Sequence, residues 1–351
     1  SAYGNMSSWD VSLVTSMNGV FANLPNNFNE DVAAWNVSRV TDMSRMFYGA
    51  SAFDRDLSAW DVSLVTTMEY MFKGASAFDR DLSSWDTSRV VKMREMFRSA
   101  SSFNGNISSW DVSQVTTMQS MFHYATSFNR DLSSWDVSKV GSMLEMFRAA
   151  SSLVDGGLSA WDVSNVQQMG EMFYDCHKFN GDISSWDVSN VQSMFQMFYN
   201  ARSFDRDLSS WDVSKVSNIG GIFIGAESFS QKLCWNLEKP SAPSNPLAGT
   251  DGALLCDCPA GTVYNQDVGQ GTSCAWKCPS GTSYVISDAG TAGCISQQSN
   301  VSAELRFSSE TLRLAVVWFS NDPGGATSAY GDISSWDVSL VTTMRGAFEN
   351  L

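Results

Sequence analysis

The sequence is poor in histidine, in basic residues and in long apolar runs, and each shortage argues against a class of function. It has only 2 histidines and no recognisable catalytic or nucleotide-binding motif, so we expect no enzyme, no cofactor and no metal centre. Lysine and arginine total 22 against 37 acidic residues, which argues against nucleic-acid binding because phosphate contacts need clustered cations. No apolar run approaches the ~20 residues of a membrane-spanning helix, so no span is expected.

Cysteine is almost absent from the first two thirds of the chain. Cys176 stands alone there, at an alanine position of the repeat described below. We expect it to be a small buried residue, and a free thiol that links two chains is the alternative. The other six cysteines lie between Cys234 and Cys294 in a stretch rich in Gly, Pro and Ser. Such a cluster is typical of disulfides in an oxidising compartment.

Two similar segments suggest how these cysteines pair. CPAGTVYNQDVGQGTSC spans 258–274 and CPSGTSYVISDAGTAGC spans 278–294. Because the two segments have the same length and pattern, we expect each to form the same disulfide between its first and last cysteine. A zinc site is the competing interpretation, and the lack of a nearby histidine argues against it. The C-P-x-G-T pattern is similar to small EGF-like or receptor-type cysteine modules. The predicted disulfides are Cys258–Cys274, Cys278–Cys294 and Cys234–Cys256.

Four N-x-S/T triplets agree with a secreted protein. They begin at Asn5, Asn36, Asn106 and Asn300, and each is a candidate N-glycosylation site. Together with the cysteine cluster they predict an extracellular or cell-surface location.

A 25-residue repeat dominates the chain. Its pattern, F-x-x-D-L-S-x-W-D-V-S-x-V-x-x-M-x-x-M-F-x-x-A-x-x, covers residues 1–237 and returns at 328. Such a period is the signature of units that stack on one another, because a single unit is too small to bury its own apolar face. Tryptophan marks the repeats, at positions 9, 35, 60, 85, 110, 135, 161, 186, 211 and 235.

Each repeat contains two kinds of apolar spacing. D-L-S-S-W predicts one short strand, and the run Val40, Met43, Met46, Phe47 and Ala50 has helical spacing. A serine precedes the second run and suits the N-cap of a short helix. We therefore expect an α/β solenoid with one short strand and one short helix in each coil, the strands forming a parallel sheet. The capping serines are Ser38, Ser63, Ser88, Ser113, Ser138, Ser164, Ser189 and Ser214.

The motif resembles a known family. S-S-W-D-V-S-x-V-x-x-M-x-x-M-F, as at 184–198, is similar to the bacterial surface protein 26-residue repeat, also described as a mycoplasma-type domain of unknown function and related to BspA-like leucine-rich repeats. The resemblance implies a surface protein with a leucine-rich-repeat-like solenoid and no catalytic residues. This chain departs from it in carrying Trp where many members carry Phe.

Charged residues recur at two positions of the repeat. The aspartates after tryptophan either accept backbone amides at a turn, which we favour, or hold Ca²⁺. The arginines of F-D-R-D and F-N-R-D are expected to form surface ion pairs, with a glycan- or sulfate-binding stripe as the alternative. The two histidines, His123 and His177, are expected at surface positions. The aspartates are Asp61, Asp86, Asp111, Asp136, Asp162, Asp187 and Asp212, and the arginines are Arg55, Arg80, Arg130 and Arg206.

The chain divides by pattern into four parts. Residues 1–237 are about ten repeats, 238–299 a linker and a disulfide-rich EGF-like segment, 300–327 a β-hairpin with a linker, and 328–351 the first coil of a further module. The last assignment rests on identity between 328–351 and 1–24 at 18 of 24 positions. The chain begins with Ser and shows no signal peptide, which favours a segment of a longer protein.

This organisation predicts a structural protein. Copies would join head to tail through the solenoid ends into a fibre, hair or surface layer, because an open solenoid end needs a cover. A cloning or proteolytic boundary at 351 is the alternative to such an array. The alternative function is a surface adhesin that recognises a protein or a glycan.

Overall fold

The structure is a computed structural model, and it describes residues 6–24, 27–233 and 235, together with the backbone of five short strands farther along. The chain divides into a first part, Ser1–Asp257, and a second part, Cys258–Leu351. The first part contains the 25-residue repeats.

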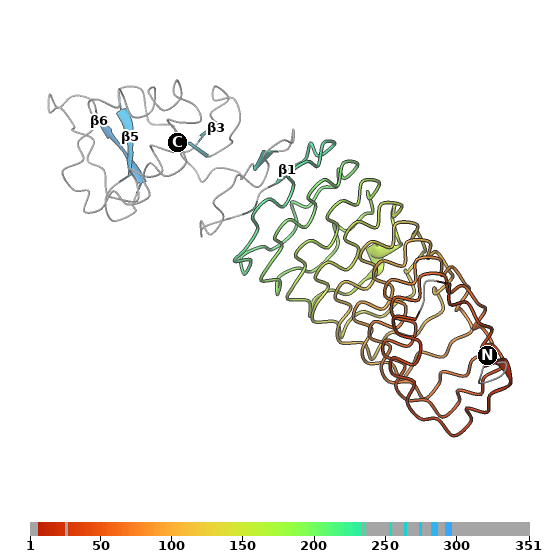
Figure 1. The fold of residues 1–351 in the computed structure, drawn as a ribbon. Coiled ribbons are helices and arrows are strands. Elements are labelled where there is room, and N and C mark those ends of the chain that lie inside the picture. The colour runs from red at the N-terminus through yellow and green to blue at the C-terminus, as the bar shows by residue number, and fades with distance from the viewer. Residues whose placement is uncertain are drawn as a thin grey trace, which may run out of the picture. The chain divides into compact units, whose positions relative to one another are not determined.

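The repeats of the first part lie on one another in register (Figure 1). Each one contributes a single residue to a continuous line of parallel β-bridges, and successive bridge residues are 25 or 26 positions apart. Every interior repeat is therefore bonded to the one before it and the one after it. The bridge residues are Ser16, Asp42, Thr67, Lys92, Thr117, Ser142, Gln168, Ser193 and Asn218.

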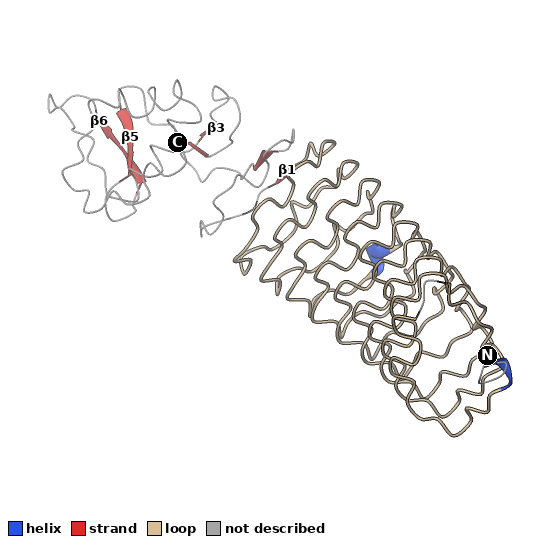
Figure 2. Ribbon diagram, in the orientation of Figure 1, coloured by secondary structure: helices blue, strands red, loops and turns tan. Residues whose placement is uncertain are grey.

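Regular secondary structure is scarce in this stack (Figure 2). Within 6–233 it consists of two 3₁₀ turns, η1 (Met6–Ser8) and η2 (Leu158–Ala160), and the strand β1 (Lys232–Leu233), which pairs in parallel with β2 (Ala253–Leu254). The expected helix and strand of each repeat are not present in these residues. Hydrogen-bonded turns follow the V-T-x-M segment in place of the helix, and the bridges lie in that segment and not in D-L-S-S-W.

Alternate backbone amides of the turn segment donate in two directions. In the second repeat, the N–H groups of Met46, Tyr48 and Ala50 donate to carbonyls three residues earlier in the same repeat. The amides between them donate to the next repeat, and we call this line of bonds the ladder. In a short helix all of these amides would donate within the repeat, whereas here half of them donate to carbonyls of the next repeat and so join the two. The ladder pairs here are Met43 to Thr67, Arg45 to Glu69, Phe47 to Met71 and Gly49 to Lys73.

This backbone needs two residues of positive φ in each repeat, four positions apart. Arg45 has φ 55° and Gly49 has φ 71°. A positive φ at the third residue of a turn closed by an i+3 to i bond is typical of a type II turn. The described residues place 13 non-glycine side chains in this region, which costs about 1–2 kcal/mol per residue relative to glycine.

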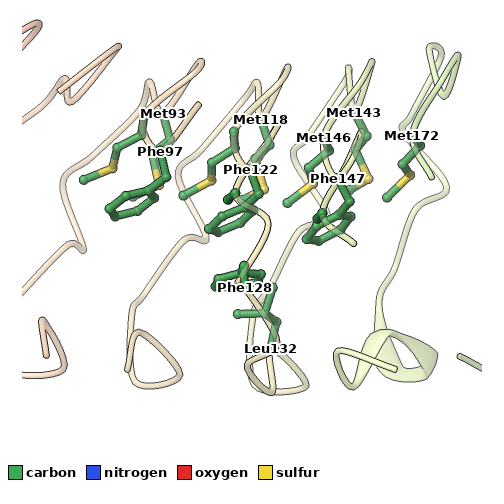
Figure 3. Packing of buried hydrophobic residues seen from close by; sticks show 14 of the residues in the cluster. Met93, Phe97, Met118, Phe122, Phe128, Leu132, Met143, Met146, Phe147 and Met172 are labelled. Carbon is green, nitrogen blue, oxygen red and sulfur yellow. The ribbon is translucent and has the colours of Figure 1, made fainter. Parts of the chain in front are cut away.

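Identical side chains form columns through the core. Beyond the first repeat, almost all valines, methionines, phenylalanines, tryptophans and small residues at the recurring positions are buried. Figure 3 shows methionines and phenylalanines of successive repeats lying over their counterparts. Phe47 and Phe72, on the ladder, have ring centroids 5.4 Å apart, and Trp110 and Trp135, farther round the repeat, have theirs 6.4 Å apart. Hydrogen-bonded strands lie ~4.8 Å apart. The repeats therefore fan out away from the ladder, which lies on the shorter side of the stack.

The tryptophans also hydrogen-bond between repeats. The indole Nε1–H of Trp110 donates to the backbone carbonyl of Leu82 at 2.9 Å. Equivalent bonds reach back 27 to 29 residues along the chain. A phenyl ring would fill the same space but could not donate, which is a physical reason for Trp at this position. The other donors are Trp35, Trp60, Trp85, Trp135, Trp161, Trp186, Trp211 and Trp235.

The segment between Trp135 and Trp161 carries an extra residue without breaking the columns. The spacing from Trp135 to Trp161 is 26, and the added length is taken up by Gly156, Gly157 and the turn η2. The two indole rings still stack at 6.4 Å with an interplanar angle of 1°. Insertions on this side therefore leave the core register intact.

The two cysteine segments of the second part share one strand register. β3 (Val263–Tyr264) pairs antiparallel with β4 (Cys274–Ala275), and β5 (Thr282–Ile286) pairs antiparallel with β6 (Ala292–Ser296). Tyr264 lies opposite Cys274 as Tyr284 lies opposite Cys294. The internal similarity thus extends to the backbone. The predicted disulfides, the hairpin at 300–327 and the coil at 328–351 lie outside the described residues.

Replacing Trp110 with Phe tests the indole bond. The change removes the indole donor to the Leu82 carbonyl, which keeps only the backbone N–H of Trp85, and it leaves a small void, so we expect the free energy of unfolding to fall by about 2–3 kcal/mol. Phe103→Leu, a volume loss in the same repeat without a lost hydrogen bond, should cost roughly 1–2 kcal/mol. Chemical denaturation measures both, and equal losses would contradict a role for the indole donor.

Two glycine-to-alanine changes test the turn conformation. Gly74 has φ +76° and its nearest neighbour would lie 3.5 Å from an added Cβ, so Gly74→Ala is limited by strain and not by space. We expect a loss of about 1–2 kcal/mol in the free energy of unfolding. Gly141, with a nearest atom at 3.9 Å and no positive φ, should instead be stabilised by about 0.4–1 kcal/mol on the same change. Effects of the same sign would refute the assigned backbone.

Candidate functional site

The aspartates after tryptophan accept backbone amides, as we favoured. Asp86 Oδ1 accepts the N–H of Ser88 at 3.1 Å, and the hydroxyl and amide of that serine lower the pKa of the Asp86 carboxyl. The serines therefore donate to the turn and do not cap a helix, which corrects their expected role. Among the described residues, no group of three or more His, Cys, Asp or Glu side chains is arranged to hold a metal. The same Asp–Ser bond is made by Asp10, Asp61, Asp111, Asp136, Asp162, Asp187 and Asp212.

The arginines of the F-D-R-D motif act mainly on the backbone, which corrects the expected row of ion pairs. Arg55 Nε donates to the carbonyl of Asn29 at 2.8 Å, and Arg130 and Arg206 bond the preceding repeat in the same way. Of these arginines only Arg80 pairs with a carboxylate, that of Asp54 at 2.5 Å. The arginines thus satisfy carbonyls between repeats.

A column of Asp and Asn residues completes this edge. Asp54 Oδ1 accepts the backbone N–H of Asp79 at 3.1 Å, and each following member repeats the bond. The column breaks at Val154, which has no side-chain acceptor, and there its backbone carbonyl accepts the N–H of Asn180. The Asp and Asn side chains of this column therefore hold neighbouring repeats together. Its other acceptors are Asn29, Asp79, Asn104, Asn129, Asn180 and Asp205.

The candidate glycosylation sites in the described residues share one geometry. Asn36 Oδ1 accepts the hydroxyl of Ser38 at 2.7 Å, and Asn106 Oδ1 accepts that of Ser108 at 2.9 Å. Asn36 is exposed, whereas Asn106 lines a polar recess of about 570 Å³. Asn5 and Asn300 lie outside the described residues.

His123 is buried, and its expected surface position is wrong. Its ring Nδ1 lies 3.0 Å from Glu145 Oε2, but neither ring nitrogen has a hydrogen bond of good geometry. Burial, with Arg98 and Arg148 nearby, lowers the pKa of His123 to about 4 against the opposing effect of Glu145. The residue is only 4% exposed, which the sequence position alone did not reveal. His177 is half-buried, with Nδ1 3.0 Å from the Asn200 carbonyl.

Cys176 is buried, as expected for the alanine position. Its Sγ lies 2.9 Å from the carbonyl of Phe147, and burial raises the pKa of the thiol. A buried thiol of raised pKa is a poor nucleophile and cannot reach another chain. The alternative of a linking thiol is not supported.

The first repeat exposes a face that the interior repeats cover. Trp9 is 41% exposed and Val20 is 46% exposed, whereas their counterparts in the third repeat, Trp60 and Met71, are buried. In interior repeats the ladder carbonyls accept amides from the repeat before, but among the described residues no backbone amide donates to their four counterparts here. This face, which we call the open end, offers both apolar surface and hydrogen-bond acceptors. Its carbonyls are those of Ser16, Asn18, Val20 and Ala22.

The repeat matches a known protein family. A family model described as "Mycoplasma protein of unknown function, DUF285" matches residues 1–91, 80–156, 143–250 and 319–351. The chain belongs to this DUF285 family. No curated protein and no solved structure matches it significantly. The family description assigns no activity, so function has to be argued from the surfaces of the stack.

Over the described residues of this DUF285 chain, no helix has the length and apolar character needed to cross a bilayer.

On the outer side of the ladder, aromatic and charged side chains such as Arg45, Tyr70 and Lys73 gather in neighbouring repeats. Sequence reasoning missed them because it searched for residues that recur. The available signal was the opposite: these positions vary while the rest of the repeat does not.

A pH titration of two histidine variants tests the burial of His123. The folded pKa of about 4 lies below the unfolded value of 6.5, so the stabilisation is complete above pH 6.5 and is lost as pH falls toward 4. We expect His123→Gln to remove about 1–3 kcal/mol of this pH dependence. His177→Gln, which removes a half-buried imidazole elsewhere in the stack, is the control for the substitution itself. Parallel curves for the wild type and His123→Gln would show that the ring is solvated.

Proposed function

We propose that this chain is an extracellular structural protein whose leucine-rich-repeat-like solenoid joins copies end to end into a fibre, hair or surface layer. The observation that carries the proposal is the open end, with its exposed Trp9 and Val20 and its ladder carbonyls without backbone donors among the described residues. The proposal assigns the chain no catalytic role and no cofactor.

The ladder supplies a mechanism for joining. Interior junctions use three or four of these bonds, so a repeat from a second copy placed on the open end would make about four backbone hydrogen bonds, each worth about 0.5–1.5 kcal/mol. It would also cover the exposed apolar side chains, at ~25 cal/mol per Å². The contact between two copies would therefore use the same kinds of bonds as the contact between two repeats within one copy.

The sequence offers a matching donor set. In the first repeat the amides of Met17, Gly19, Phe21 and Asn23 donate to the second repeat. Residues 328–351 carry the same residues at the same spacing, as Met344, Gly346, Phe348 and Asn350. We propose that these amides bond the open end of the next copy, so that one copy follows another in the register of the stack.

Other features support an extracellular setting for such an assembly. The six cysteines from Cys234 to Cys294 suit disulfides, and Asn36 presents an exposed glycosylation triplet. A net charge of −15 favours solubility of the lateral surfaces, so that contact is left to the ends.

Charge placed at the open end should prevent assembly. Val20→Lys puts an ammonium group where a second copy would have to cover it, so we expect filaments or oligomers of the wild-type chain to revert to single particles. Val154→Lys is the matched control, since Val154 is also 46% exposed but lies on the lateral surface. Light scattering and electron microscopy measure the outcome.

The assembly experiment has a clear negative result. Single particles of the wild-type chain at all concentrations, or equal disruption by both lysine variants, would contradict end-to-end joining. Thermal unfolding of the variants checks that each one is folded.

A further inference from the structure

The outer side of the ladder is the variable side of the repeat. At M-x-x-M-F-x the methionines and the phenylalanine point into the core and recur, while the third and sixth positions of this motif differ from repeat to repeat. We call the surface formed by these two positions the ladder face. Its members include Arg45, Tyr48, Tyr70, Lys73, Glu95, Arg98, His123, Glu145, Arg148, Glu171, Tyr174 and Tyr199.

A recess of about 440 Å³ lies at the start of the ladder face. Lys73 Nζ lies 5.6 Å from the ring centroid of Tyr48 and 5.4 Å from that of Tyr70, so the ammonium group sits against both rings. The guanidinium of Arg45 lies 5.1 Å from the Tyr70 ring. The two tyrosines are only partly buried, which leaves aromatic surface in the recess. Ala22, Asn23 and Glu95 complete the lining.

Positive charge is concentrated here in a strongly acidic protein. Glu95, the carboxylate of the recess, is almost completely buried and already paired, with Lys73 at 2.6 Å, Arg98 at 3.3 Å and Arg94 at 3.4 Å. Arg94 lies 5.9 Å from the Tyr70 ring and adds a further cation. The cations outnumber the single carboxylate, so the recess attracts an anion although the whole chain carries −15.

One further pair of ring and cation lies along the ladder face. The guanidinium of Arg148, which also pairs with Glu171, lies 4.3 Å from the Tyr174 ring, and Tyr174 stacks on Tyr199 at 4.6 Å. Aromatic surface thus recurs over several repeats. A ligand with a repeating structure would meet similar contacts at successive positions, which a small isolated anion would not exploit.

We propose that the ladder face binds an acidic polysaccharide, with one sugar ring against the tyrosines of the recess and its carboxylate or sulfate beside Arg45 and Lys73. Tyrosine suits this ligand because its ring packs on the C–H face of a pyranose while its hydroxyl reaches sugar hydroxyls. The cations supply the charge contact, and repetition along the stack supplies multivalent binding.

The recess adjoins the open end through Ala22, but the side chains that would bind the ligand, those of Arg45, Tyr70 and Lys73, belong to the second and third repeats. They lie on the side of the stack, so an assembled fibre would still present them, and the binding and assembly experiments test the two proposals separately. The position of Arg39 in the same repeat as Arg45 provides a control, because this arginine is also exposed but follows the W-N-V-S segment, away from the ladder face.

Binding of the intact chain to immobilised polysaccharides tests the proposal. The probes are hyaluronan for carboxylate, chondroitin sulfate for sulfate, dextran as a neutral polymer and polyglutamate as an acidic peptide. We expect binding to one or both acidic polysaccharides that weakens with salt. Arg45→Gln should weaken it about two- to fivefold, the loss expected for one exposed cation, while Arg39→Gln leaves it unchanged.

Tyr70→Leu distinguishes sugar binding from simple anion attraction. It removes the ring but no charge, so we expect a loss of affinity for the polysaccharide comparable to that of Arg45→Gln. Failure to bind both acidic polysaccharides would overturn the proposal, as would equal binding of dextran or polyglutamate, equal weakening by Arg39→Gln, or no effect of Tyr70→Leu. An unchanged thermal unfolding midpoint confirms that each variant is folded.

Discussion

The structure depends on the way backbone amides are shared between repeats. In each turn segment half of the amides close turns inside the repeat and half donate to the repeat ahead, as Met46 and Phe47 illustrate. Neither set alone holds a 25-residue segment in place, because a short run of turns gains too little to offset its loss of conformational entropy. Stability therefore belongs to the junctions, and each repeat folds as a neighbour of another.

The side chains reinforce the same constraint. The Trp110 indole, the Asp54 carboxylate and the Arg55 guanidinium each bond a backbone group of an adjacent repeat. The hydrogen-bonding roles that in a larger fold would be met by helices and sheets are met here by side chains at fixed positions of the repeat. This is why so much of the repeat recurs: a residue that bonds its neighbour's backbone has to be the same in every layer.

The positions released from this constraint are where function can reside. The open end has ladder carbonyls that no described residue fills, and the ladder face carries Tyr70, Lys73 and other side chains that point away from the core. Membership of the DUF285 family identifies the repeat but brings no activity with it. The end suits joining of copies and the face suits a ligand, and a stack can offer both because its core involves neither.

The sequence by itself determined the period, the register and the core. Val40, Met43, Met46, Phe47 and Ala50 are all buried, as their spacing predicts, and the tryptophans stack in a column. Only the tertiary structure decided the backbone between them. Turns closed by i+3 to i bonds return apolar residues to one side at the same intervals as a helix, so the pattern cannot separate the two. The choice falls to the ladder, since bonds to a neighbouring repeat exist only when that repeat is already in place. The same holds for His123 and for the recess at Tyr70, whose environments are made by residues one repeat away in space and 25 away in the chain.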